Sequence, residues 1–327
     1  MLIPLRPDCQ TNAVWYWANT VDQARMSSLL SSDASCVFIK AGYWEAGKKG
    51  LVFRQTKMNG FKPAVPVRPS VHLVFPFTVS RGEDLDKLIF SLPSAIERSI
   101  RSFRSAGFPV AGIQFDVEGE VTAGEYLGLI RGAERALRGL QLSACFFPSM
   151  LKTCASAALL KELDFICVMF YDLSYDSADY RMTDADWINE TSAELGALGK
   201  PFFAGIPVYS CITVFDAAGR LIHRRIDLPN FSVFSSDRVS LLEPGTNGLR
   251  RYRVAKAFSY KYLSFKPGML LYLYDPGAEE VGSLLARISV KSSFFRGFSF
   301  FSCPVKERFA FSFADLLTLL SLRSPGY

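Results

Sequence analysis

The sequence predicts an α/β protein, a (β/α)8 TIM barrel with an insertion between strands 7 and 8. Short apolar segments alternate with longer amphipathic ones along most of the 327 residues. Such alternation is typical of parallel sheets, and units of about 30–40 residues suit a barrel. An open doubly wound sheet, the main alternative, needs a glycine-rich loop after its first strand. The turn here reads WANTVDQA and contains no glycine.

Eight apolar segments have the length and composition of buried strands, and most are followed by a helical segment. In chain order the predicted strands are 13–19, 36–44, 70–77, 110–118, 140–147, 164–172, 201–210 and 296–302. The segment LVFRQT is assigned to a hairpin after the second strand.

Amphipathic segments with apolar residues three and four positions apart predict the helices. They cover 21–30, 83–104, 122–140, 149–163, 184–198, 278–289 and 313–322. Pro93 is expected to break or restart the helix over 83–104, because proline lacks the backbone N–H. The segment TDAD provides a cap for the helix that begins at Asp184.

Residues 211–265 are less regular and richer in Ser, Arg and Gly, and we interpret them as an insertion. The strand-like segment 268–275 is assigned to it as well, so one barrel domain of 1–327 carries an insertion over about 211–275. The densest basic segment, LRRYRVAK, lies inside it. The whole chain has a net charge of only +6, so this segment is expected to be a solvated surface, and no nucleic-acid partner is expected.

Composition excludes several classes of protein. An apolar share of 49% with 28 phenylalanines excludes a disordered chain. Seven cysteines without a CxxC pair and only two histidines make a metal centre or a Ser/His/Asp triad improbable, so no metal or cofactor is expected. No apolar run approaches the ~20 residues of a membrane span, and no signal peptide is expected.

Strand 110–118 has an unusual polar row. Gln114, Asp116 and Glu118 alternate with three apolar residues, which is the period of a strand. In a barrel the apolar residues face the helices and the polar row faces the interior, with Glu118 at the C-terminal rim and Gln114 deepest. Burying a carboxylate costs several kcal/mol of folding free energy, so a buried acid is expected to have an ion-pair partner or a function. Among the predicted barrel strands only Lys40 and Arg296 could supply a purely structural ion pair, and Arg296 lies at the start of its strand, the opposite end of the barrel.

Two acids in one pocket disfavour each other's ionisation, and the usual outcome is one protonated acid and one carboxylate. That division suits cleavage of a glycosidic bond. A carboxylate site for Mg²⁺ or Ca²⁺ that includes Asp172 is an alternative, although the spacing does not require it.

Three strand motifs resemble those of glycoside hydrolase family 18, the chitinase-type barrels. GIQFDVE resembles the fourth-strand signature DGxDxDxE, in which Asp116 and Glu118 are kept while Ala111 and Gln114 replace two acids. VMFYD resembles the sixth-strand MxYD, and AGIPVYS resembles the seventh-strand GlPfYg. The matching residues are Met169, Tyr171, Asp172, Gly205, Pro207 and Tyr209. The overall pattern is also similar to a bacterial family of unknown function.

The resemblance implies roles for these residues. Glu118 would be the general acid and Asp116 would orient the N-acetyl group of the substrate, with Tyr171 and Asp172 as hydrogen-bonding partners of that group. Gln114 cannot take the proton that the family's acid shares with Asp116. The expected partner is a carbohydrate, either an N-acetylated glycan or a peptidoglycan fragment. Phe301 replaces a sugar-stacking tryptophan, so a barrel that binds glycan or protein without cleaving it is the alternative.

Aromatic and polar residues at other strand ends complete the candidate site. Trp15 and Trp17 alternate on the first strand and could form either an aromatic floor or part of the core. Asn19 follows on the same face and could bind a hydroxyl group. Tyr43 and Trp44 end the second predicted strand and could line a cleft.

Overall fold

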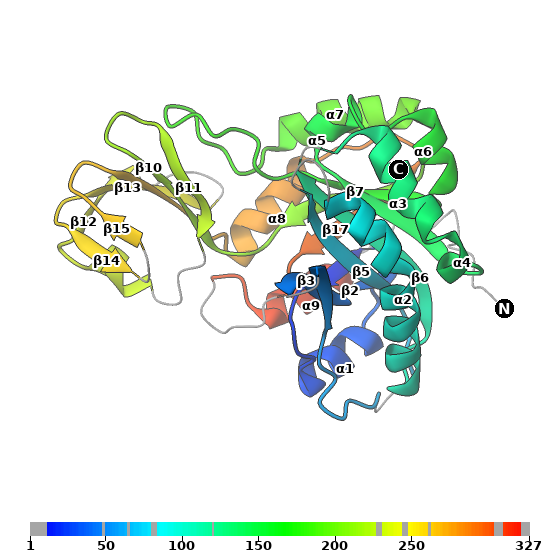
Figure 1. The fold of residues 1–327 in the computed structure, drawn as a ribbon. Helices are drawn as coiled ribbons and strands as arrows, with labels where there is room; N and C mark the ends of the chain where they lie inside the picture. The colour runs from blue at the N-terminus through cyan, green and yellow to red at the C-terminus, as the bar shows by residue number, and fades with distance from the viewer. Residues whose placement is uncertain are drawn as a thin grey trace.

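The structure is a computed structural model that describes residues 12–47, 50–63, 66–79, 84–119, 121–226, 231–243, 248–260, 263–303 and 310–321. Eight parallel strands close into a barrel in the order β1-β17-β9-β8-β7-β6-β5-β2 (Figure 1). They are β1 (Ala13–Tyr16), β2 (Cys36–Lys40), β5 (Ser70–Val79), β6 (Val110–Gly119), β7 (Gln141–Phe146), β8 (Phe165–Met169), β9 (Phe202–Pro207) and β17 (Phe295–Phe301). The predicted barrel is confirmed.

Helices cover the outside of the barrel (Figure 1). They are α1 (Gln23–Ser31), α2 (Asp84–Ser105), α3 (Ala123–Gly132), α4 (Glu134–Leu137), α5 (Pro148–Leu151), α6 (Ala157–Glu162), α7 (Ala185–Ala197), α8 (Ala278–Arg287) and α9 (Phe313–Ser321). One apolar cluster, with Ile113 and Phe115, fills the layer between strands and helices. A second, with Trp15, Phe38 and Phe165, fills the barrel interior.

Helix α2 continues through Pro93, so the predicted break there is wrong. An interior proline costs about 3 kcal/mol because it removes a helical hydrogen bond. Against this, α2 buries Leu92, Ile96 and Phe103 almost completely. Each such side chain contributes about 1.5–3 kcal/mol on burial, which offsets the cost of the proline.

Two other predicted helices are divided. Residues 122–140 form α3 and α4, and 149–163 form α5 and α6. The second division has a local cause, because the hydroxyl of Ser156 accepts a hydrogen bond from the backbone N–H of Leu159 at 3.2 Å and begins a new helix. The predicted cap at Asp184 is present, with its carboxylate accepting from the backbone N–H groups of Asp186 and Trp187.

Several strands end earlier than predicted. The segment 36–44 is one barrel strand only to Lys40, after which the chain enters a hairpin of β3 (Gly42–Gly47) and β4 (Gly50–Gln55). A Cβ atom at Gly42 would lie 2.2 Å from the Arg54 carbonyl oxygen, so glycine permits this close pairing. The predicted hairpin exists, but Tyr43 and Trp44 belong to it rather than to the second barrel strand.

The insertion between β9 and β17 is more regular than the sequence indicated. It contains a five-stranded antiparallel sheet in the order β11-β10-β16-β13-β12, which stands beside the barrel in Figure 1. Its strands are β10 (Cys211–Phe215), β11 (Leu221–Ile226), β12 (Val239–Glu243), β13 (Leu249–Val254) and β16 (Leu270–Tyr274), with the short pair β14 (Phe258–Tyr260) and β15 (Leu263–Phe265) nearby. As assigned, 268–275 falls in the insertion. That residues 1–327 form one domain stays a prediction.

One buried side chain joins the first and last strands of the barrel. Asn12 accepts a hydrogen bond from the Phe298 backbone N–H at 3.3 Å and donates one to the Leu319 carbonyl at 2.8 Å. These contacts tie the start of β1 to β17 and to α9.

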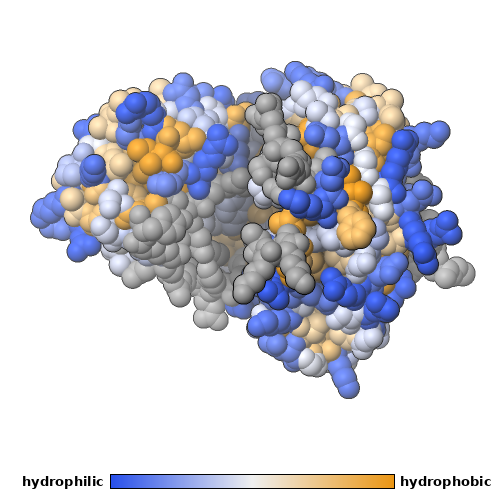
Figure 2. Space-filling model, in the orientation of Figure 1, coloured by the Kyte–Doolittle hydropathy of each residue, from blue (hydrophilic) through white to orange (hydrophobic). Residues whose placement is uncertain are grey.

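In the described part of the chain no helix is long and apolar enough to cross a membrane. The face in Figure 2 carries hydrophilic side chains with hydrophobic areas among them, over both the barrel and the second sheet.

His72 is fully buried on β5, and it makes stability depend on pH. Burial in the barrel interior lowers the pKa of its imidazole to about 4. The unfolded chain binds this proton from about pH 6.5 downward and the folded chain only from about pH 4. We therefore expect up to about 3 kcal/mol of stability, present above pH 6.5, to be lost as the pH falls to 4. Urea denaturation across this range, compared with His72→Asn, measures the contribution. An identical pH slope in both proteins would contradict it.

Candidate functional site

Strand β6 carries three polar side chains toward the barrel interior. Gln114 is fully buried, Asp116 is 3% exposed, and Glu118 is partly exposed at the end of the strand. The intervening Ile113 and Phe115 belong to the outer core, as the alternation predicts. The row therefore rises from the packed interior to the mouth of the barrel, with a carboxylate at the top.

Asp116 and Glu118 line one cavity of about 330 Å³ at this mouth. Its other lining residues are Trp17, Lys40, Tyr43, Trp44, Leu51, Pro76, Phe77, Thr78 and Leu88. Besides β6, the walls thus come from the end of β1, the end of β2, the hairpin after it, β5 and α2. Aromatic rings beside two acids are suited to an uncharged polar ligand with an apolar face, such as a sugar ring.

Lys40 lies in this cavity but does not neutralise the acids. It forms no ion pair with Asp116 or Glu118, and its Nζ lies 5.3 Å from the ring centre of Trp17 and 5.5 Å from that of Tyr43. Burial lowers the pKa of its ammonium group. The purely structural ion pair with Lys40, which the sequence left open, is therefore not formed.

The groups below Glu118 are uncharged apart from Asp116. The amide nitrogen of Gln114 donates to Ser143 Oγ at 3.3 Å and to Cys167 Sγ at 3.1 Å. Asp116 lies against the buried thiol of Cys145, and burial followed by the charge of this carboxylate raises the pKa of that thiol well above its usual value. Gln114 is thus held by the neighbouring strands β7 and β8.

The residues of the sixth-strand motif lie just beyond β8. Met169 is its last residue, and its sulfur accepts a hydrogen bond from the Tyr171 hydroxyl at 2.6 Å. Asp172 has a left-handed backbone with φ of +62°, which turns the chain out of the strand direction. Tyr209 lies beyond β9, and its ring stands edge-on to that of Tyr171 at 6.0 Å.

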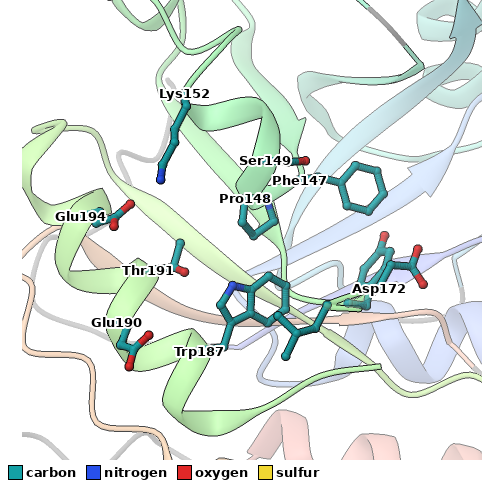
Figure 3. A pocket seen from close by; sticks show the side chains of 11 residues that line it. Phe147, Pro148, Ser149, Lys152, Asp172, Trp187, Glu190, Thr191 and Glu194 are labelled. Carbon is teal, nitrogen blue, oxygen red and sulfur yellow. The ribbon is translucent and has the colours of Figure 1, made fainter. Parts of the chain in front are cut away.

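Tyr171 and Asp172 line a second cavity, of about 400 Å³, rather than the cavity of Glu118 (Figure 3). Between the two cavities runs a row of rings. Phe301 lies 5.3 Å from Trp17 and 5.8 Å from Tyr171, measured between ring centres. The structure thus brings Asp116 and Glu118 together in one cavity with Trp17. It places Tyr171 and Asp172 in the second cavity, at the other end of this row of rings.

The remaining candidates divide between core and surface. Trp15 is 1% exposed and belongs to the interior cluster. Trp17, next on the same face, is partly exposed and lines the cavity of Glu118. Asn19 is exposed and lies outside the linings of both cavities.

Several lining residues were not found from the sequence. Lys40 was considered only as an ion-pair partner, although a lysine at a strand end is itself a signal for the barrel mouth. Trp187, Glu190 and Glu194 line the second cavity from α7, an outer helix whose pattern gives no such signal. Among the described residues no group of three His, Cys, Asp or Glu side chains could hold a metal ion.

Comparisons of the sequence found no matching family model and no similar curated protein. Comparisons of the structure did find matches. The Bacillus cereus spore cortex-lytic enzyme SleL is 13% identical with a TM-score of 0.56, over 97% of this chain and 75% of that one. YKL-39, solved in the presence of chitooligosaccharides, is 12% identical with a TM-score of 0.58, over 96% and 100%.

A family 18 chitinase from Cycas revoluta, solved as a mutant in complex with (GlcNAc)4, is 15% identical with a TM-score of 0.52, over 95% of this chain and 98% of that one. At such identities the likeness concerns the fold. The resemblance indicated by the strand motifs is confirmed at that level: the chain shares its barrel fold with the chitinases of glycoside hydrolase family 18.

Proposed function

We propose that the protein is a glycoside hydrolase that cleaves an N-acetylated glycan, with Glu118 as the general acid. The observation that carries this proposal is the cavity that Glu118 and Asp116 share with the rings of Trp17 and Trp44. Support also comes from Glu118 itself, which forms no hydrogen bond or ion pair with the described residues and is partly exposed. Its carboxyl group is therefore available to a ligand.

The chemistry is a substrate-assisted displacement with retention. Glu118 gives its proton to the glycosidic oxygen while the acetamide oxygen of the substrate attacks the anomeric carbon, so the bond to the leaving sugar breaks as a ring closes. Asp116 orients the acetamide and balances the charge that develops on its nitrogen. Glu118, now a carboxylate, accepts a proton from the water that opens the ring, which restores the acid.

The proposed substrate lies along the ring row. A sugar ring over Trp17 and Phe301 would extend toward Tyr171 and Tyr209, with Asp172 beside it, as the motif resemblance implies. Phe301 offers an apolar face in place of tryptophan, although without an indole N–H. Met169 supports this arrangement through its contact with the Tyr171 hydroxyl.

The second candidate is a barrel that binds glycan or protein without cleaving it. One observation favours it, since Tyr171 and Asp172 line a different cavity from Glu118. Gln114 adds to this, because its amide cannot share a proton with Asp116.

Product analysis separates the two candidates. We expect the protein to cleave N-acetylglucosamine oligomers or peptidoglycan fragments, to leave cello-oligosaccharides intact because they lack the acetamide, and to release products that keep the anomeric configuration of the cleaved bond. Proton NMR during the first minutes of reaction detects that configuration. Inverted product would contradict the mechanism, and binding without any product would favour the second candidate.

A further inference from the structure

The second cavity extends beyond Tyr171 and Asp172 to the outer helix α7. Its walls are the chain from Phe147 to Lys152, which includes α5, and the face of α7 that carries Trp187, Glu190, Thr191 and Glu194 (Figure 3). It holds about 400 Å³, which is enough for one sugar unit or an amino-acid side chain. The proposed chemistry at Glu118 does not use this wall.

The cavity carries an excess of negative charge. Three carboxylates line it, those of Asp172, Glu190 and Glu194, against one ammonium group, that of Lys152. Neither glutamate forms an ion pair with Lys152 or with any other residue in the ranges described. Glu190 and Glu194 are one helical turn apart, so both project from the same face of α7.

The hydroxyl of a largely buried threonine and an aromatic ring complete the wall. Thr191 is only 8% exposed, yet its hydroxyl has no hydrogen-bond partner among the described residues. In Figure 3 it lies between Lys152, Glu194 and Trp187. Trp187 is held edge-on against Phe170, with ring centres 5.4 Å apart, and the Asp184 cap fixes the start of its helix. The wall is thus built on a rigid element and has an acceptor left for a ligand.

We propose that this cavity binds a primary ammonium group carried by the glycan, and the proposal rests on the glycan function above. Carboxylates, a hydroxyl oxygen and the face of an indole are the groups that bind an ammonium ion. The ammonium group has two sources, an amino sugar that has lost its acetyl group or an amine on a peptide attached to the glycan. The protein would then prefer glycans with a free amine near the cleaved unit.

Binding measurements on a protein that cannot cleave test the proposal independently of turnover. The protein with Glu118→Gln is titrated calorimetrically with two pairs of probes. One pair is an N-acetylglucosamine tetramer with one free amine and its fully acetylated counterpart. The other is a disaccharide peptide ending in lysine and the same molecule with that side chain acetylated.

In this background Glu190→Gln together with Glu194→Gln should weaken binding of at least one amine-bearing probe by roughly tenfold at low salt, since each lost charge pair is worth about three- to fivefold. The acetylated counterparts should bind unchanged. Lys152→Met should strengthen binding of the same probe by about threefold, and raised salt should reduce both effects. Glu134→Gln on α4 serves as the matched control and should change nothing.

If the substitutions change the affinity for the amine-bearing tetramer, the amino sugar is the source of the ammonium group. If they change the affinity for the peptide probe, the source is the amine on the attached peptide. The inference would be overturned if the two glutamate substitutions weakened binding of the amine-bearing and the acetylated probes equally. It would also be overturned if they weakened binding of neither amine-bearing probe, or if no probe bound at all. Thermal melting of each variant checks that α7 is still folded. If the unmodified protein cleaves no glycan while the charge effects persist, the proposed hydrolysis fails and the ammonium site stands.

Discussion

Glu118→Gln is expected to lower the turnover of an N-acetylated glycan by about 10²–10⁴-fold, the usual contribution of a general acid. The amide has almost the same shape as the acid but no proton to give to the leaving oxygen. Binding should survive, because the rings of Trp17 and Phe301 are unaffected. Release of reducing sugar, measured beside calorimetric affinity for the same oligomer, separates the two effects.

Glu97→Gln provides the matched control for this variant. Glu97 is exposed on α2 and lines neither of the two cavities described. Its substitution removes the same charge and should leave turnover and thermal melting as they are. Unchanged turnover with Glu118→Gln would remove Glu118 from the reaction, and the proton for the leaving oxygen would then have to come from another group.

Trp15→Ala is expected to lower the free energy of unfolding by about 3–5 kcal/mol, the usual cost of removing a fully buried large ring. Trp15 is 1% exposed and touches Trp17, Phe38 and Phe301, with ring centres 5.3–5.9 Å away. Because it is packed from several strands, the cavity left behind cannot collapse easily. Urea denaturation measures the loss directly.

Trp17→Ala removes another tryptophan ring, two residues further along the chain, and should affect binding more and stability less than Trp15→Ala. Trp17 is partly exposed and lines the cavity of Glu118, so its loss should cost less stability and weaken glycan binding by about tenfold. Equal stability losses for the two substitutions would show that both rings are core. Such a result would also remove the aromatic wall on which the sugar is proposed to lie.

The sequence predicts the barrel and the orientation of β6 because both follow from local periodicity. A strand has a period of two, and a closed parallel barrel has only an inside and an outside. Once Ile113 and Phe115 are assigned to the helices, Gln114, Asp116 and Glu118 must face inward. No knowledge of the other strands is needed for that step.

The periodicity of apolar residues does not predict where the neighbouring strands and helices end. The strand motifs place Tyr171 and Asp172 at the same rim as Glu118, yet the left-handed backbone at Asp172 turns the chain toward α7. The second cavity depends on that turn and on a helix more than ten residues further along. Likewise the continuity of α2 through Pro93 depends on burial against the barrel, which the sequence around the proline does not contain.

The contacts of Asn12 have a consequence for how the protein is made. Its two hydrogen bonds join residues 286 and 307 positions apart, and β1 pairs directly with β17. During synthesis at roughly 5–20 residues per second, β1 therefore lacks one of its two neighbouring strands until the chain has been made as far as β17. The inserted sheet, whose first and last strands β10 and β16 pair with each other, completes its own hydrogen bonds before then. Barrel closure is thus a late event with a high contact order. Until then, the unpaired edge of β1, with its apolar side chains, is the surface that a chaperone would have to shield.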